Sequence, residues 1–383
     1  MTATLLAPGP PRAKSTAARS GHLLFGIVLT LATALRLLVM LGYNTAQLYW
    51  YDSFEYLDTA VHLRPGGQFH PAGYPWFLWV LRPFHSVEVI AGRAARDEAR
   101  RRSAAAAPVA ARLGSLADDG AGVVRPDVRG REHSVLSDLQ VYFLLVGALT
   151  VLMWRDRVST RAAAAAGLLI ALATLTRTAA LPLLGLAVLY LLLRRAGRRR
   201  IVAIAAAGTL PLGAYAVWYH QHHGVFALSC ADGVSLWART MMFADCSVIK
   251  PPTELAALCP NGTVVDAASE YVRAPGASLN RLPGGAFAHN AQARDFAVGA
   301  VLAQPLDYLR DVVKDTSLAS TWEPVAHPRR VGTPDGSFAR GSWPVPMEGQ
   351  SLVVKARTGY DPDIRGLASV EPFGTVLAAY RYP

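Results

Sequence analysis

The sequence predicts a mainly α-helical protein, built as a polytopic membrane helix bundle and followed by an extracytoplasmic domain of mixed helical and irregular structure. The chain of 383 residues is 52% hydrophobic and only 17% charged, whereas a soluble domain carries about 25% charged residues. Several apolar runs approach the roughly 20 residues that a helix needs to cross a bilayer. Arginines gather at the ends of these runs, as membrane topology requires.

The formal net charge of +11 also suits a protein that binds nucleic acid. The position of the arginines argues against that class, because basic residues beside apolar runs are what the orientation of membrane helices demands. We therefore expect membrane lipids, and no nucleic acid, as partners.

The N-terminal region predicts a cytoplasmic tail and one uncleaved span. Residues 1–20 are polar and basic, and the following apolar run, GHLLFGIVLTLATALRLLVMLGY, occupies 21–43 and contains Arg36. The run is too long for a signal-peptide core and no small-residue cleavage site follows closely. The basic tail orients the N-terminus toward the cytoplasm. Residues 43–71 are therefore expected on the outer side.

The predicted transmembrane domain extends over 21–219. Its later spans are expected at 139–154, 162–176, 179–193 and 201–219. Basic clusters at 155–161 and 194–200 place both connecting loops in the cytoplasm. The turn at Arg177 and Pro182, and everything from His220 onward, then lies outside.

One segment does not fit this topology. Residues 91–134 carry nine arginines without an apolar run of span length, and 71–91 either crosses the membrane or lies on its surface. Part of this stretch, 91–131, is either a long cytoplasmic loop or a product of out-of-frame reading in a GC-rich gene. The nucleotide sequence of the gene decides between these alternatives.

Residues 220–383 are too polar to span a membrane and predict an outer domain. Apolar residues recur at roughly helical spacing on both sides of Pro305, which predicts two short amphipathic helices lying on the membrane domain. They are Phe296, Val298, Val301, Leu302, Leu306, Leu309 and Val312. From about 321 onward, Pro, Gly and aromatic residues predict irregular loops.

All three cysteines fall in this outer, oxidising region, where disulfides form. Cys246 and Cys259 are the expected pair, which leaves Cys230 without a partner. His220, His222 and His223 resemble a metal cluster, but their spacing fits no tight metal motif. We therefore expect no metal or other cofactor, and an interfacial or lipid-phosphate role for His220.

Four short motifs share the predicted outer face. They are YDSFEYL (51–57), FHPAGYPWFL (69–78), EHSVLSD (132–138) and LTRTAALPLL (175–184). Their order and placement resemble the GT-C glycosyltransferases, polytopic membrane enzymes that use polyprenyl-phosphate-linked sugars, and especially the bacterial protein-mannosyltransferase-like branch. The resemblance covers about 1–90 and 132–320.

The resemblance implies transfer of a sugar, such as mannose or arabinose, from a polyprenyl-phosphate donor to an acceptor hydroxyl of a glycan, lipid or protein. Asp52 matches the catalytic carboxylate of the first outer loop, which takes the proton of the attacking hydroxyl. Arg177 is the best placed cation for the leaving phosphate. The residues expected to bind substrate are Glu55, His70, Tyr74, Glu132, His133, Asp138, Arg177 and His220.

Each assignment has a structural alternative. Asp52 and Asp138 also suit helix caps, Glu55 a capping-box partner, and Arg177 a side chain that snorkels to lipid headgroups. Two other functions also stay open. A transporter places charges along a substrate path, although it usually has paired halves rather than one large outer domain. An inactive membrane scaffold presenting 220–383 is the other.

Overall fold

The computed structural model of the protein describes residues 50–82, 135–155, 157–318 and most of 342–380, together with isolated positions between 30 and 48. Within those residues every regular element is a helix, and the only strand-like pairing is a single antiparallel bridge between Ser342 and Ala368. The prediction of a mainly α-helical protein is therefore confirmed for this part of the chain. The predicted span 21–43 lies mostly, and the segment 91–131 wholly, outside the described residues.

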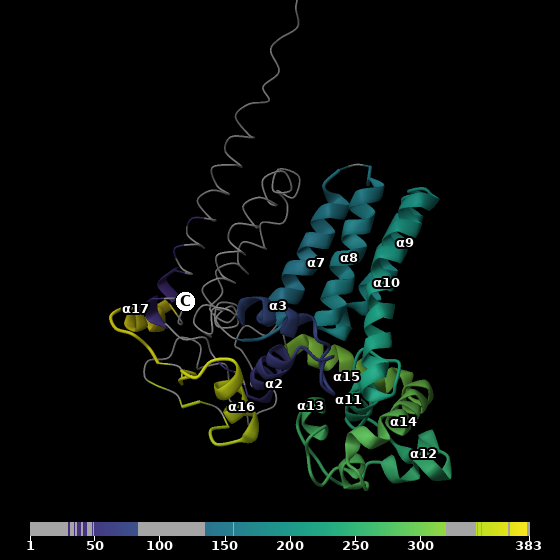
Figure 1. Ribbon diagram of the computed structural model, residues 1–383. Helices are drawn as coiled ribbons and strands as arrows, with labels where there is room; N and C mark the ends of the chain where they lie inside the picture. The colour runs from purple at the N-terminus through teal and green to yellow at the C-terminus, as the bar shows by residue number, and fades with distance from the viewer. Residues whose placement is uncertain are drawn as a thin grey trace, which may run out of the picture.

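Four apolar helices alternate in direction and form a bundle (Figure 1). Each overlaps one of the later predicted spans, and α8 packs against α7, α9 and α10. Their bounds are α7 Asp138–Met153, α8 Thr160–Thr176, α9 Leu181–Leu193 and α10 Arg198–His223. The basic clusters fall at one end of the bundle because both loops between successive helices lie there, and Arg177 lies at the other end.

Local chemistry explains where these helices begin and end. The Ser159 hydroxyl accepts the N–H of Ala162 at 3.1 Å and caps α8, which satisfies one of the free donors of the first turn. Pro182 stands in the first turn of α9, where its missing N–H costs nothing. Gly224 ends α10 with a positive φ of 75°, the left-handed conformation that favours glycine.

Only α10, among the described helices, is long and apolar enough to cross a membrane. Its 26 residues correspond to about 39 Å of helix, against about 30 Å of hydrocarbon. The helices α7, α8 and the stretch Thr178–Leu193 are apolar but shorter. The structure thus shows one candidate membrane span. Among the described residues it does not show the bundle of several spans that the sequence predicted.

Small residues bring the bundle helices into backbone contact. A Cβ added to Gly167 of α8 would lie 2.3 Å from the carbonyl oxygen of Ile204 in α10, which real side chains do not tolerate. Large apolar side chains instead face outward, including Val146 (58% exposed), Leu186 (57%) and Leu210 (70%). The described part of the bundle therefore carries large apolar side chains on its surface.

A second core joins segments from opposite ends of the sequence. Helices α2 (Trp50–His62), α3 (Gly73–Leu81) and α16 (Ser351–Gly359) enclose Phe54 and Leu57, both 0% exposed. The Tyr360 hydroxyl, just after α16, donates to the Leu78 carbonyl at 3.0 Å. One more short helix, α17 (Phe373–Tyr380), follows. The far C-terminal segment therefore completes the packing of α2.

Residues 232–303, called the outer unit after the location that the sequence predicts for them, have their own core. The outer unit contains α11 (Asp232–Thr240), α12 (Cys246–Ile249), α13 (Ala268–Tyr271) and α14 (Asn290–Ala303), with 3-10 turns η3 (Thr253–Leu258), η4 (Ser278–Arg281) and η5 (Ala286–His289) between them. Trp237 is fully buried at its centre, and its indole N–H donates to the Leu258 carbonyl at 2.9 Å. Gly233 allows α11 to touch α14, since a Cβ there would lie 1.9 Å from the Asn290 oxygen.

The predicted break at Pro305 is confirmed, because α14 ends at Ala303 and α15 runs from Pro305 to Leu318. The apolar residues that predicted these helices differ in how deeply they are buried. Phe296 is buried in the core of the outer unit, whereas Leu306 and Leu309 are 77% and 56% exposed. The described part of the protein therefore leaves Leu306 and Leu309 of α15 largely uncovered, whereas Val312 is half-buried.

A disulfide links Cys246 to Cys259, the expected pair, and Cys230 is a free thiol. The bridge spans 13 residues of sequence, and loop closure on this scale constrains the unfolded chain by about 3 kcal/mol. We expect the double substitution Cys246→Ser, Cys259→Ser to lower the stability of the outer unit by about that amount. Non-reducing peptide mapping tests the pairing, and two free thiols at these positions would rule it out.

Candidate functional site

The first part of the site lies on one face of α2. Asp52 stands in the first turn of this helix, where the helix dipole favours a carboxylate. Glu55 and Tyr56 follow at spacings of three and four residues, so they share its face. Among the described residues the Asp52 carboxylate makes no hydrogen bond that supports the alternative role of a helix cap, and it forms an ion pair with His70.

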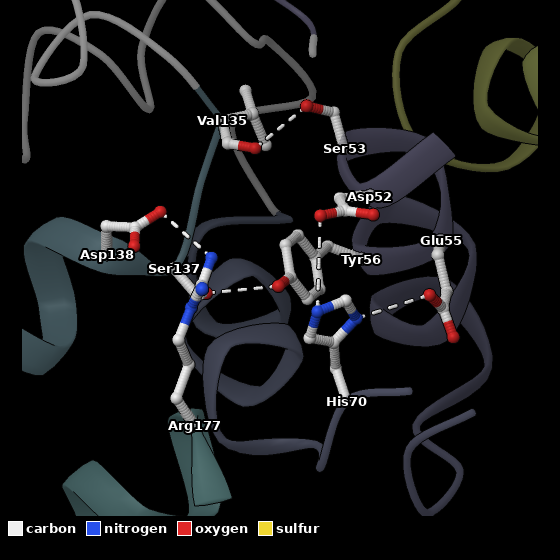
Figure 2. A network of polar contacts seen from close by, with 9 residues as sticks. All are labelled: Asp52, Ser53, Glu55, Tyr56, His70, Val135, Ser137, Asp138 and Arg177. Atoms are coloured by element: carbon white, nitrogen blue, oxygen red, sulfur yellow. Dashed lines mark hydrogen bonds and ion pairs between the residues drawn. The ribbon is translucent and has the colours of Figure 1, made fainter. Parts of the chain in front are cut away.

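His70 brings the two carboxylates together (Figure 2). Its Nδ1 lies 3.4 Å from a Glu55 oxygen, and its Nε2 lies 4.0 Å from an Asp52 oxygen. The side chains of His70 and Glu55 are 18% and 14% exposed, and that of Asp52 is 30% exposed. Asp52 is thus the most open of the three to an incoming molecule.

The turn that carries His70 is anchored to the bundle. The hydroxyl of Tyr215 in α10 accepts the N–H groups of Gly66 and Ala72 at 2.9 and 3.1 Å. A Cβ added to Gly67 would lie 2.0 Å from a Glu55 oxygen, so a side chain at this position would displace the Glu55 carboxylate. The position of His70 against α2 is therefore set by a residue about 145 positions further along the chain.

The second part of the site lies at the end of the bundle. Arg177, in the turn between α8 and η2 (Thr178–Ala180), donates its Nε to the Ser137 hydroxyl and one terminal nitrogen to Asp138, both at 2.9 Å. Its other terminal nitrogen has no hydrogen-bond partner among the described residues. The guanidinium is about one third exposed. It is therefore held in one orientation with donor capacity left over.

Tyr56 connects the two parts. Its hydroxyl lies 3.0 Å from the Ser137 oxygen, and its ring centroid lies 5.0 Å from that of His70. Figure 2 shows the ring between the Arg177 side and the Asp52 side. Burial raises the pKa of Tyr56, so its hydroxyl stays protonated and neutral at physiological pH. Sequence reasoning missed Tyr56 and Ser137, although the spacing of Tyr56 from Asp52 and the position of Ser137 beside Asp138 pointed to them.

Removing the Tyr56 hydroxyl tests this connection. We expect Tyr56→Phe to lower stability by about 1 kcal/mol, because a buried hydrogen bond to Ser137 is lost. Tyr51→Phe, on the same helix, is the matched control. The Tyr51 hydroxyl has no such bond among the described residues, and we expect little change there. Equal thermal shifts in the two variants would show that the Tyr56–Ser137 contact contributes nothing.

The outer unit approaches the same face of α2. The guanidinium carbon of Arg273 lies 5.1 Å from the ring centroid of Tyr51 and 5.6 Å from that of Phe69. Phe69 also meets Phe287 edge-on at 4.8 Å. Arg273 is exposed and forms no ion pair with a described carboxylate. It adds a cation over the rings of Tyr51 and Phe69 that the sequence did not single out.

The remaining predicted residues are placed differently. Tyr74 is 4% exposed and packs edge-on against Tyr56, behind the polar cluster. His220 lies in the last turn of α10, stacked on Phe226 at 3.9 Å, and makes no described contact with the Asp52 group. Glu132 and His133 lie outside the described residues. Within the described ranges, no three His, Cys, Asp or Glu side chains are arranged to hold a metal ion.

The arrangement combines the partly exposed carboxylate of Asp52 with the guanidinium of Arg177, whose orientation is fixed by Ser137 and Asp138. A carboxylate accepts a proton from a hydroxyl that approaches it, and a guanidinium with unused donors binds a phosphate or carboxylate oxygen. Comparisons with protein-family models, with curated proteins and with solved structures each found no match.

Proposed function

We propose that this protein is a GT-C-type membrane glycosyltransferase. It moves a sugar from a polyprenyl-phosphate donor to an acceptor hydroxyl at the outer face of the membrane. One observation carries the proposal: Asp52 and Arg177, far apart in the sequence, are linked by a chain of contacts through His70, Tyr56 and Ser137. The contact between Tyr56 and His70 is made by their rings, and the other contacts are polar. A base and a phosphate-binding cation are the two groups that this transfer requires of the protein.

The surroundings of this network support a membrane setting. Only 22% of the most apolar 18 residues of α10 are buried, whereas the core helix of a soluble protein is mostly buried. The network lies at the end of the bundle opposite both basic clusters (Figure 1). Basic residues mark the cytoplasmic side of a membrane protein, so the proposed site faces outward.

In the proposed reaction, the acceptor oxygen attacks the anomeric carbon as the bond from that carbon to the phosphate oxygen breaks. The acceptor proton passes to the Asp52 carboxylate, and the polyprenyl phosphate leaves with the bonding electron pair. This single displacement inverts the configuration at the anomeric carbon. His70 limits the freedom of Asp52, since the imidazole lies 4.0 Å from its carboxylate and is itself held by Glu55.

Arg177 receives the negative charge of the departing phosphate. Its bonds to Ser137 and Asp138 fix the plane of the guanidinium in advance, so little ordering remains when the anion forms. In this proposal Asp138 does not contact the lipid-linked sugar. It orients Arg177, which contacts the phosphate, so its role is positioning rather than the predicted substrate binding.

Lipid-linked sugar labelled in both parts tests the proposal. Membranes containing the protein are incubated with polyprenyl-phosphate mannose or arabinose, and free polyprenyl phosphate and labelled acceptor are measured. A glycosyltransferase produces both. Movement of intact donor across the membrane would show a transporter instead, and no change in the donor would leave only the scaffold interpretation.

A further inference from the structure

Helix α15 has the reverse of the polarity expected of a surface helix. Asp311, only 7% exposed, points into the protein, where Arg239 of α11 lies 3.2 Å from its carboxylate. Asp315 pairs with the same arginine. Soluble amphipathic helices bury their apolar side and expose their charges. Here an ion-pair cluster faces inward and the apolar side faces out.

The outward side of α15 carries exposed apolar side chains, which together with Leu302 are called the apolar stripe. Leu306, Leu309 and Val313 recur at helical spacing and are 77%, 56% and 60% exposed. Leu302, at the end of α14, extends the stripe with 76% exposure. Contact of four large apolar side chains with water is unfavourable, so a surface that exposes them usually contacts another molecule or a membrane.

We propose that α15 lies in the membrane–water interface on the outer side, with this stripe among the lipid acyl chains. The inference rests on the membrane setting of the proposed function, but not on its chemistry. Interfacial helices combine an apolar face with basic residues that meet anionic headgroups. Arg310 has an 86% exposed side chain and Lys314 is exposed on α15, although Asp307 lies 4.0 Å from Arg310.

The position of α15 in the fold agrees with a location in the membrane–water interface. Figure 1 shows α15 running crosswise to the bundle helices, at the level of the bundle end that carries Arg177. A helix in the plane of the interface has that direction relative to helices that cross the membrane. The short link 224–231 between α10 and α11 keeps the outer unit close to this level.

The size of the stripe favours lipid over a second protein. A stable protein interface uses about 20–30 residues on each side, whereas the stripe consists of four side chains on consecutive helices. An interfacial helix needs only such a narrow face, since it enters the bilayer by about 5–10 Å.

Lipid-borne quenchers test the proposal on the full chain. In a Cys230→Ser background, Leu309→Cys is labelled with a small fluorophore and the protein is placed in nanodiscs of phosphatidylcholine and phosphatidylglycerol containing brominated lipid. Val264→Cys is the control, because Val264 is 86% exposed and lies in an irregular segment of the outer unit rather than on an apolar helix face. We expect lipid to quench the Leu309 label at least about twofold more strongly than the Val264 label.

A third label separates this inference from the function on which it rests. Leu210, 70% exposed on α10, is labelled in the same way. If the Leu210 label is quenched and the Leu309 label is not, the proposal for α15 is wrong but the membrane location of the bundle stands. If neither label is quenched, both the proposal for α15 and the membrane location are wrong. A cross-link between two Leu309→Cys chains, with no lipid quenching, would show a second copy as the occupant. The Asp52→Asn protein should give the parental pattern.

Discussion

Replacing Asp52 with Asn is expected to reduce sugar transfer at least a hundredfold, within the range of about 10²–10⁴ that a positioned base contributes. Asn has the same size and suits a helix terminus as well as Asp does, so folding and membrane insertion should be unchanged. It cannot accept the acceptor's proton. The measurement is the rate of polyprenyl phosphate release, with binding of the lipid-sugar as a separate readout.

Glu55→Gln is the matched control for this substitution. Glu55 lies on the same helix face but is less exposed than Asp52 and is oriented toward His70, so its loss should cost much less. A transfer rate for Asp52→Asn close to that of the parent would refute the role of Asp52. The base would then be sought at Asp138, or at Glu132.

The largest expected effect on stability lies in the outer unit. Replacing Trp237 with Ala should lower the free energy of unfolding of this unit by about 3–5 kcal/mol, the usual cost of removing a large buried aromatic side chain. Trp237 is 0% exposed, and its indole is the partner of the Leu258 carbonyl. The substitution therefore leaves a large cavity and removes one of the two hydrogen bonds of the Leu258 carbonyl, which keeps the bond from the Ser278 hydroxyl.

Denaturant unfolding followed by proteolysis of the 232–303 region measures this effect. Val264→Ala is the control in the same unit, since an 86% exposed side chain contributes little and its truncation should change stability by less than about 0.5 kcal/mol. If Trp237→Ala is as stable as Val264→Ala, the core of the outer unit is not arranged around Trp237.

Much of the helical pattern follows from local sequence. The apolar runs predict α7 to α10 because uninterrupted apolar residues favour helices and basic clusters mark their ends. The hairpin at Arg177 and the break at Pro305 also follow from nearby residues, since a proline in a helix interior removes a backbone hydrogen bond and disfavours continuation of the helix. The sequence alone does not separate the prolines at these two places from Pro211, which α10 accommodates in its interior. Whether α7, α8 and α9 cross a membrane does not follow from this pattern, because each is shorter than a full span.

The site was predictable only in part, because its geometry depends on distant contacts. The motif around Asp52 identified α2, and the motif around Arg177 identified the end of the bundle. That His70 reaches both carboxylates depends on Tyr215 holding the turn at Gly66 and Ala72, which no local pattern reveals. The exposed side of α15 was also missed, since helical spacing identifies an apolar face but not what covers it.

The contact between α2 and α16 has a consequence for biosynthesis. At about 5–20 residues per second, the roughly 300 residues between the two helices take about 15–60 s to synthesise. During that interval Phe54 and Leu57 lack the partners that α16 contributes to their core in the finished protein. The helix that carries Asp52 therefore acquires its final packing only after residues near Tyr360 have emerged. We expect the protein to gain its activity late, as a property of the nearly complete polypeptide, with earlier nascent chains depending on the membrane or on chaperones to shield α2.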